Sequence, residues 1–459
     1  MVEYFTKDHW NVLLSGNCRA ELLNKNVDDL YQLTNIDKPY NGDIHSASED
    51  EKKFVVNDLQ QYISAAHDSH LTSQNMLTPI KDILATLNKK QEATQTVQIN
   101  SKEYMSGKKS HEVEKMSSVV DILAQHCNTH QVLDIGSGKG YLSTHLSLKY
   151  GMKVTAIDCN DDNTTGASQR AEKFLSYWRK HLNGRHTKES GAAAAVINND
   201  SLKLESVTAY VAASTDPSKF LPQSCEHNIE DACIVTGLHT CGDLCSTVIS
   251  MFVTNKLIKG LCVVGCCYHL ISESNNETGT FPMSDFLATK SFSLGRNKRM
   301  LALKAPERHA VMNPKQQREK SERSLFYRAV LSVILKEKYG LKSDSKDACI
   351  GKIFSKSHSF LDYIRRSLNK LRLDSSLLSD EEIDNYLQSY EPRFKELVAF
   401  SMIRHQYGPA VESIIVLDKY LYLLEQVKNT GIEKCFIGEV FDPILSPRCF
   451  ALIASKSIT

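Results

Sequence analysis

Short apolar segments alternate with amphipathic helical segments through the middle of the chain. Five of the apolar segments are rich in β-branched residues and are typical of buried strands: residues 131–136, 153–158, 207–214, 232–239 and 260–267. A helical pattern separates the first two segments, and another follows the second. This alternation predicts an α/β fold, in which a mainly parallel sheet carries helices on both faces.

The chain on either side of this alternation is mainly helical. Residues 54–70 and 82–91 carry apolar positions at helical spacing and indicate a helical domain before the sheet. More helices are expected after residue 310, and two final apolar segments joined by Pro-Ile-Leu-Ser-Pro predict an antiparallel hairpin that completes the sheet. The predicted parts are a helical accessory domain, the first part of the sheet domain, a helical insert and the completion of the sheet, at residues 1–105, 106–309, 310–410 and 411–459.

The composition excludes several classes of protein. The 55 Lys and Arg residues balance 54 Asp and Glu residues, so a formal net charge of +1 excludes a histone-like polycation. No uncharged apolar run reaches the about 18 residues that a membrane-spanning helix needs, and the first residues lack the apolar core of a signal peptide. The 13 cysteines are an odd number scattered along a long chain. We therefore expect reduced thiols, no membrane contact, and a cytoplasmic or nuclear location.

A glycine-rich turn follows the first predicted strand. The sequence places Asp134 at the end of that strand, glycines at Gly136, Gly138 and Gly140, and the start of a helix at Tyr141. Glycines at such a turn let the backbone approach a ligand that a Cβ atom would exclude. The dinucleotide-binding fingerprint requires a small residue where this chain has Tyr141, so the turn argues against a nicotinamide cofactor.

The pattern Asp-x-Gly-x-Gly-x-Gly resembles the first motif of class I methyltransferases, which bind S-adenosylmethionine. This resemblance implies that the loop cradles the amino-acid part of the cofactor, with Asp134 near its amino group. Asp158 ends the second strand, 20 residues after Gly138, where a carboxylate can accept hydrogen bonds from both ribose hydroxyls. Asp216 resembles the acid that meets the adenine amino group. The expected cofactor-binding residues are Asp134, Gly136, Ser137, Gly138, Gly140, Asp158 and Asp216.

Cysteine and histidine side chains gather after the fourth and fifth predicted strands. Because the carboxyl ends of parallel strands meet at one edge of a sheet, we expect these side chains near the methyl group. The set is His239, Cys241, Asp243, Cys266, Cys267 and His269. Three interpretations stay open: zinc ligands, residues that remove a proton from an acceptor, and small residues that pack a strand end. The spacing is irregular and contains no Cys-x-x-Cys pair, so we assign no metal.

Several longer strings are similar to the family of methyltransferase-like protein 25 and its paralogue. They are DIGSGKGYLSTHLSLKYGMKVTAID, GLHTCGDL, VVGCCYHL, FPMSDFL, LGRNKRMLA and FDPILSPRCFALIA, and the similarity runs from about Lys108 to the last residues. The resemblance implies an S-adenosylmethionine-dependent methyltransferase. His-x-Cys-Gly followed by Cys-Cys-x-His is more distantly similar to tRNA 2′-O-methyltransferases. Those enzymes carry N-terminal zinc-finger modules, and no such spacing occurs in residues 1–105.

A basic run follows the fifth strand. Residues 296–323 contain nine Lys or Arg residues and three acids, a local net charge of +6. Arg296, Lys298 and Arg299 are therefore expected to contact the phosphates of an RNA acceptor, and a solvated helix face is the alternative. RNA is the acceptor we expect. A protein acceptor and a non-catalytic scaffold with a methyltransferase fold are the other interpretations.

The expected reaction is in-line transfer of a methyl group, with catalysis coming chiefly from the placement of the acceptor. His239, Asp243 and His269 are the residues expected to position the acceptor or to remove its proton, since an imidazole titrates near neutral pH. Cys241 and Cys267 are expected to line the catalytic site.

Overall fold

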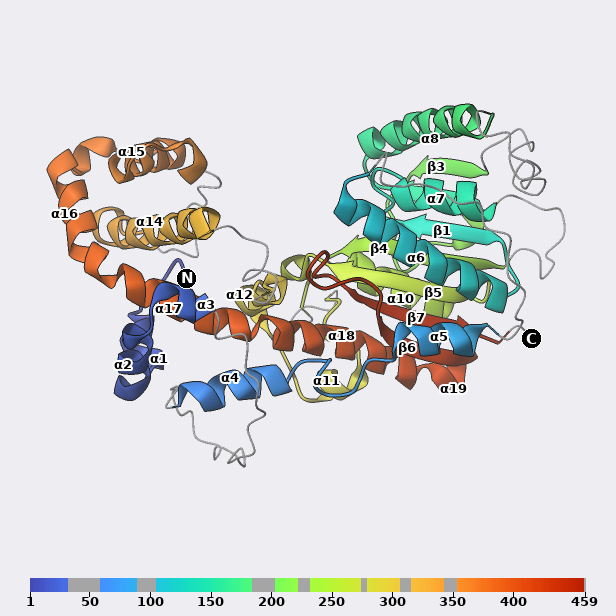
Figure 1. Cartoon of the computed structure of the whole chain (residues 1–459), viewed down its shortest axis with the longest axis horizontal. Helices are drawn as coiled ribbons and strands as arrows, with labels where there is room; N and C mark the ends of the chain where they lie inside the picture. Colours follow the sequence, from blue (N-terminus) through green and yellow to red (C-terminus); the bar gives the residue numbers. More distant parts are fainter. Residues whose placement is uncertain are drawn as a thin grey trace. The chain divides into compact units, whose positions relative to one another are not determined.

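The computed structural model describes residues 1–31, 58–88, 105–183, 203–221, 232–273, 279–305, 315–341 and 353–457. The chain forms two compact units (Figure 1). The sheet unit comprises residues His70–Leu303 and Ala410–Thr459, and the helical unit comprises residues Met1–Ser69 and Lys304–Pro409. Neither unit is a single stretch of sequence.

The sheet unit contains a seven-stranded sheet in the order β3-β2-β1-β4-β5-β7-β6. The strands are β1 (Gln131–Ile135), β2 (Lys153–Asp158), β3 (Leu204–Thr208), β4 (Cys233–Cys241), β5 (Ile258–Cys266), β6 (Ile432–Glu439) and β7 (Phe450–Lys456). Strands β1 to β5 pair in parallel, and β7 runs antiparallel to both β5 and β6. The predicted α/β class and the predicted antiparallel hairpin are both confirmed.

Helices cover both faces of this sheet (Figure 1). The helices of the sheet unit are α5 (Ile80–Leu87), α6 (Gly107–His126), α7 (Tyr141–Tyr150), α8 (Asp161–Asn183), α10 (Leu244–Thr254), α11 (Asp285–Thr289), α12 (Gly295–Arg299), α18 (Gly408–Glu425) and α19 (Val427–Thr430), with short 3₁₀ helices η3 (Pro217–Phe220), η5 (Tyr268–Leu270) and η6 (Leu301–Leu303). Successive strand residues point to opposite faces. Val132 of β1 therefore joins an apolar cluster with Met116 of α6, whereas Leu133 joins another cluster with Val248 of α10.

The third strand differs from the prediction. The sequence predicted a strand at residues 207–214, but β3 covers Leu204–Thr208. The reason is the length of its neighbour, because β2 ends at Asp158, and Asp158 pairs with Thr208. The N–H of Ala209 donates to the carbonyl of Asp158 at 3.0 Å, and β2 offers no strand residue beyond Asp158, so the chain leaves the sheet after this bond. Tyr210 in this segment is 83% exposed.

The helical unit has one core, drawn from both ends of its sequence. Its helices are α1 (His9–Leu13), α2 (Gly16–Asn24), α3 (Val27–Tyr31), α4 (Leu59–Asp68), α14 (Lys315–Tyr339), α15 (Phe360–Leu371), α16 (Asp380–Tyr390) and α17 (Phe394–Gln406), with 3₁₀ helices at Phe354–Lys356, Ser375–Leu377 and Glu391–Arg393. Tyr4 and Leu22 are buried in the same apolar cluster as Phe326 and Phe400. None of the helices that the structure describes is both long enough and apolar enough to cross a membrane.

This shared core corrects the predicted domains. An accessory domain at 1–105 and a separate insert at 310–410 were expected, but the first 69 residues and residues 304–409 form one unit. The stretch that begins at His70 belongs to the sheet unit instead. The physical reason is that α5 packs on the sheet: Thr78 donates its N–H to the carbonyl of Ile437 in β6 at 2.9 Å, and Ile83 joins the apolar cluster of α6.

Candidate functional site

The glycine loop between β1 and α7 has an unusual backbone. Gly136, Gly138 and Gly140 have φ values of 73°, 55° and 69°, in the left-handed region that side chains disfavour. The N–H groups of Gly136 and Ser137 donate to the carbonyl of Ile157 at 2.8 and 3.1 Å, which fixes the loop to the end of β2. The predicted strand, turn and helix are therefore present, and the loop lies at the carboxyl edge of the sheet.

The three glycines serve different purposes. A Cβ atom on Gly136 would lie 2.9 Å from Leu244 Cδ2, and one on Gly140 would lie 2.7 Å from Ala167 Cβ, so both glycines allow close packing of helices. A Cβ atom on Gly138 would meet no atom nearer than the carbonyl of Gly136 at 4.0 Å. Gly138 therefore leaves open space beside the loop rather than making room for a neighbouring helix.

Asp158, at the end of β2, faces this open glycine. Its Oδ2 atom accepts the N–H of Gly138 at 2.9 Å, while its Oδ1 atom accepts the N–H of Asn160 at 2.9 Å and the side-chain amide of Asn163 at 3.1 Å. A carboxylate oxygen can accept two hydrogen bonds. Oδ2 therefore keeps capacity for a hydroxyl donor, and the half-buried side chain is accessible to one.

Asp134, at the end of β1, is 1% exposed. Its carboxylate accepts a hydrogen bond from the Ser143 hydroxyl. Burial raises the pKa of Asp134 to about 6; the Ser143 hydrogen bond opposes this rise, and the negative charge of Asp158 adds to it. The loop thus has a carboxyl group beneath it whose ionised form is costly.

A buried hydroxyl in the loop has no hydrogen-bond partner among the described residues. The Ser137 Oγ atom is buried and makes no hydrogen bond within the part of the chain that the structure describes. Buried polar groups are normally bonded, so an orphaned one in a ligand loop fits a ligand with polar groups of its own. The open space at Gly138, the spare capacity of Asp158 and this hydroxyl together fit a cofactor that carries an amino-acid part and a ribose.

Asp216 does not join this group. It was expected just after the third strand, but β3 ends at Thr208, and Asp216 lies beside η3. Its carboxylate accepts the N–H and the hydroxyl of Ser218 at 3.0 and 2.7 Å, which caps η3 and lowers the pKa of Asp216. The exposed side chain thus has a local structural role, and the predicted contact with adenine has no support in this geometry.

His239, in β4, lies against an acid that the sequence did not single out as a site residue. The Nε2 atom of His239 is 3.3 Å from Glu112 Oε2, and the Ser446 hydroxyl donates to Glu112 Oε1 at 2.6 Å. Lys108 and Lys109 also lie within 3.5 and 3.1 Å of this carboxylate. Burial alone would raise the pKa of Glu112, but the hydrogen bonds from His239 and Ser446 and the charge of Lys109 hold it well below its usual value.

A signal for Glu112 was present in the sequence. It lies in α6 beside Val113 and one turn before Met116, both fully buried, so an acid stands in the apolar stripe of that helix. An ionisable group on a buried helical face needs partners. The two lysines three and four residues before it supply part of that partnership, and β4 supplies the rest.

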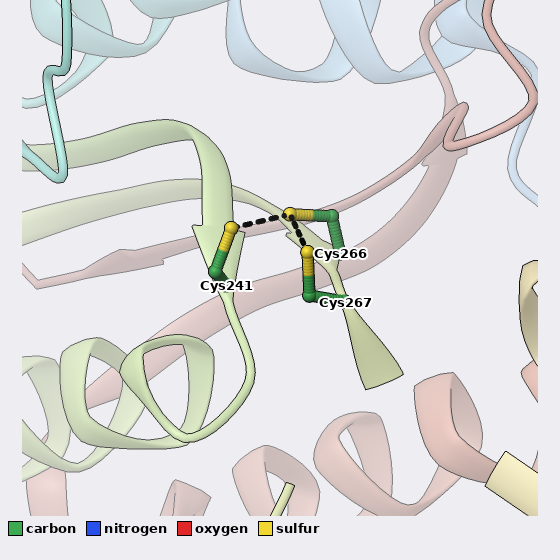
Figure 2. Close-up of side chains that lie close together, drawn as sticks. All are labelled: Cys241, Cys266 and Cys267. Atoms are coloured by element: carbon green, nitrogen blue, oxygen red, sulfur yellow. Dashed lines mark hydrogen bonds between the residues drawn. The ribbon is translucent and has the colours of Figure 1, made fainter. Parts of the chain in front are cut away.

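Three cysteine sulfur atoms point toward one another at the ends of β4 and β5 (Figure 2). The Cys241 and Cys266 Sγ atoms are 3.0 Å apart, and the Cys266 and Cys267 Sγ atoms are 3.8 Å apart. Hydrogen bonding to Cys266 lowers the pKa of Cys241, burial opposes this, and the nearby charge of His239 assists it. The same contact, together with burial, raises the pKa of Cys266, so Cys241 is the thiol that ionises first.

The other two residues predicted for catalysis are placed differently. Asp243 Oδ1 accepts the N–H of Ser272 at 2.7 Å and the hydroxyl of Thr280, so this oxygen fixes the loop that contains those residues. His269 is half-buried, and its Nδ1 atom is buried without a partner among the described residues. Burial lowers the pKa of His269, and the charges of Arg296 and Arg299 lower it further.

The three cations predicted to contact the substrate have different environments in the structure. Arg299 is buried, forms an ion pair with Glu273 and donates from Nε to the carbonyl of Tyr268 at 3.2 Å. It is therefore a structural residue, and the expected phosphate contact is wrong for it. Arg296 and Lys298 on α12 are exposed. The basic run is also divided, because the sheet unit ends at Leu303 and resumes only at Ala410.

The comparisons with known proteins agree with this geometry. Residues 108–274 match the family described as a methyltransferase domain. Two relatives carry the name "Probable methyltransferase-like protein 25". The one from Homo sapiens is 32% identical, covering 99% of this chain and 93% of the relative, and the one from Mus musculus is 33% identical, covering 84% and 81%. No solved structure matches the chain.

Proposed function

Because the chain belongs to the methyltransferase-like protein 25 family, we propose that it transfers the methyl group of S-adenosylmethionine to an acceptor. The observation that carries this proposal is the open space at Gly138, bordered by the Asp158 carboxylate. Gly136 and Gly140 make room for packed helices, whereas Gly138 shares their left-handed backbone and faces open space. The absence of a side chain at Gly138 keeps a space that a ligand can fill.

We assign the contacts with the cofactor to residues of the glycine loop and to the two acids beside it. Gly138 and Ser137 bind the amino-acid part of the cofactor, with the Asp134 carboxylate beneath them to attract its amino group. Asp158 accepts a ribose hydroxyl on Oδ2. When bound, the cofactor supplies a sulfonium-activated methyl group. The chain's contribution is to hold that group beside the acceptor, which is the largest part of catalysis in such a transfer.

His239 is the residue that we propose removes the proton from the acceptor. Glu112 contacts its Nε2 atom at 3.3 Å and orients the ring, as an acid commonly orients a catalytic histidine. Glu112 thereby acts through His239 and is a positioning residue. His269 is the second candidate base, because its Nδ1 atom lacks a partner within the described residues.

RNA is the acceptor we propose, and its support is the pair of exposed cations on α12, Arg296 and Lys298. Lys and Arg contacts to phosphates position an RNA without reading its sequence. Reversing both charges should weaken RNA binding and lower the slope of log affinity against log salt concentration by about 2, because about one counterion is released for each phosphate contact. An unchanged slope would rule out these cations as the RNA contact.

The first experiment is calorimetric titration of the chain with S-adenosylmethionine and S-adenosylhomocysteine. Asp158→Ala should weaken binding by about 10- to 100-fold, because it removes a charge-assisted hydrogen bond. Asp162→Ala, which removes an exposed acid four residues away, is the matched control and should bind like the wild type. Absence of binding in a folded wild-type chain would contradict the proposal.

Labelled methyl transfer then separates the acceptors. The chain is incubated with labelled cofactor and with fractionated RNA or protein. Label in RNA supports the proposed acceptor, and label in protein replaces it. Tight cofactor binding with label in neither fraction would favour a scaffold with a methyltransferase fold.

A further inference from the structure

Three thiols converge on one point at the carboxyl edge of the sheet (Figure 2). Cys241 ends β4, Cys266 ends β5, and Cys267 follows it. Their sulfur atoms all lie within 4.8 Å of one another, with two of the separations at 3.0 and 3.8 Å. No further ligand atom of a His, Cys, Asp or Glu joins this group among the residues that the structure describes.

The backbone at Cys267 is what brings the third sulfur to this point. Consecutive residues of an extended strand point to opposite faces, so Cys266 and Cys267 would ordinarily direct their thiols apart. Cys267 instead has a φ of 51°, in the left-handed region, and its Sγ atom lies 3.8 Å from that of Cys266. A non-glycine residue in this conformation is strained. Simple packing of small side chains does not require that conformation.

The two strand ends are held together by the backbone. Cys241 is the registered neighbour of Cys266 in the parallel pair of β4 and β5. The N–H of Gly242 donates to the carbonyl of Cys266 at 3.0 Å, and Gly242 has no room for a side chain, because a Cβ atom would lie 2.8 Å from Leu270 Cβ. The sulfur atoms therefore belong to a fixed frame and not to a loose loop.

We propose that Cys241, Cys266 and Cys267 bind one zinc ion through three thiolates, with the fourth coordination position open. A tetrahedral zinc ion with Zn–S bonds of about 2.3 Å holds its thiolates about 3.8 Å apart. The separation of Cys266 and Cys267 equals that value at 3.8 Å and that of Cys241 and Cys266 is 0.8 Å shorter, so small side-chain rotations bring all three sulfur atoms to it. Each thiol releases one proton as its bond to the metal forms, and nothing is oxidised or reduced.

The exposure of the group favours an open site over a closed structural one. Cys241 is exposed, Cys267 is half-buried and Cys266 is buried, so an ion has a path to the sulfur atoms from solvent. Three protein ligands with a free position are typical of zinc sites that act on a bound water or substrate. Three thiolates also favour zinc over hard cations such as magnesium or calcium.

A disulfide is the competing use of these residues. It would join only two of the three sulfur atoms, and Cys241 with Cys266 is the pair at the shortest separation. A disulfide between Cys241 and Cys266 would not account for the left-handed backbone at Cys267, whereas a metal ion would bind all three sulfur atoms. The two hypotheses therefore predict different chemistry for Cys267.

The experiment uses the full chain, purified under anaerobic reducing conditions and freed of metal. Titration with Co²⁺ should produce a thiolate-to-cobalt charge-transfer band, and Zn²⁺ should displace it at one ion per chain, counted by elemental mass spectrometry. Cys241→Ser and Cys267→Ser should each weaken metal binding by at least about 100-fold. Cys435→Ser in β6 makes the same substitution in the same sheet outside the group, and it should bind metal like the wild type.

Circular dichroism of each variant shows whether it is folded, and the exposed Cys241 is the substitution least able to disturb the core. A wild-type chain without the charge-transfer band, or a folded Cys241→Ser chain with the wild-type band, overturns the proposal. So does a Cys241–Cys266 disulfide in the anaerobic protein. Cofactor titration of the metal-free chain is independent of these outcomes, so the zinc site and the methyltransferase proposal can fail separately.

Discussion

The two halves of the sheet edge are built in different ways. The half at β1 and β2 comes mostly from one short stretch of sequence, Asp134 to Gly140, and offers backbone N–H groups and carboxylates. The half at β4 and β5 gathers thiols and an imidazole from two strands, and Glu112 of α6 completes it. Burial disfavours the ionised form of Asp134 in the first half, whereas hydrogen bonds and positive charges favour the ionised form of Glu112 in the second half. A local motif and a non-local cluster thus lie on one edge of the sheet, and each holds a buried carboxyl group whose pKa is shifted in the opposite direction from the other.

The largest expected effect is a loss of cofactor affinity, caused by a substitution in the glycine loop at β1 and β2. Gly138→Asn should lower the affinity for S-adenosylmethionine by at least about 100-fold, because the new side chain fills the space beside the loop, while asparagine tolerates the left-handed backbone. Gly151→Asn is the control: Gly151 has a φ of 67°, ends α7, and would place a Cβ atom with no other atom within 4 Å. Calorimetry compares the two variants. Equal affinities would mean that the space at Gly138 is not a ligand site.

The second prediction tests the cost of the buried acid. Asp134→Asn should raise the free energy of unfolding at pH 7.5 by about 1–3 kcal/mol, because the folded protein no longer holds an ionised carboxyl group there. The pKa of Asp134 is raised from 3.8 to about 6, so the folded state takes up a proton before the unfolded state as the pH falls. The gain should therefore shrink between pH 6 and pH 4. Urea unfolding at both ends of this range measures it.

The same substitution should weaken cofactor binding, and this contrast distinguishes a functional acid from a merely unfavourable one. A variant that is more stable and still binds S-adenosylmethionine like the wild type would remove Asp134 from the cofactor site. Ser143→Ala is a useful companion, since it removes the hydrogen bond to Asp134 and leaves the carboxyl group in place.

The third and smallest effect has the opposite sign. Glu112→Gln should lower the free energy of unfolding by about 1–2 kcal/mol at neutral pH, because it removes the charge that His239 and Lys109 face. The pKa of Glu112 lies below its usual 4.5, so its contribution is present above that pH and is lost as the pH falls below it. Glu114→Gln, two residues along the same helix, should change stability by less than about 0.5 kcal/mol. Equal losses in both variants would contradict the special role of Glu112.

The sequence was most informative where structure is local. The bounds of β2 match the prediction, and the glycine loop has the expected turn between β1 and α7, because strand, turn and helix depend on neighbouring residues. The final hairpin was also predicted from its two apolar segments. Asp216 failed because its role depends on where β3 ends, and that is set by pairing with β2.

The rest of the site depends on contacts that sequence spacing does not encode. The group of cysteine, histidine and aspartate side chains after the fourth and fifth strands was predicted from the sequence, but the convergence of Cys267 on Cys266 depends on one left-handed backbone angle. Arg299 was predicted to contact phosphate because the sequence did not reveal its ion-pair partner, Glu273, which lies 26 residues earlier. The domain boundaries failed for a similar reason, since the first helices and the insert share a core across about 300 residues of sequence.

The position of β7 in the sheet has a consequence for synthesis. This strand lies between β5 and β6, yet residues 450–456 are the last of the sheet to leave the ribosome. Until they emerge, β5 presents an open edge of backbone N–H and carbonyl groups, and β6 lacks β7, the strand it pairs with. We therefore expect the nascent chain to depend on protection of that edge by chaperones. Stalled or truncated products lacking β7 should accumulate as aggregates.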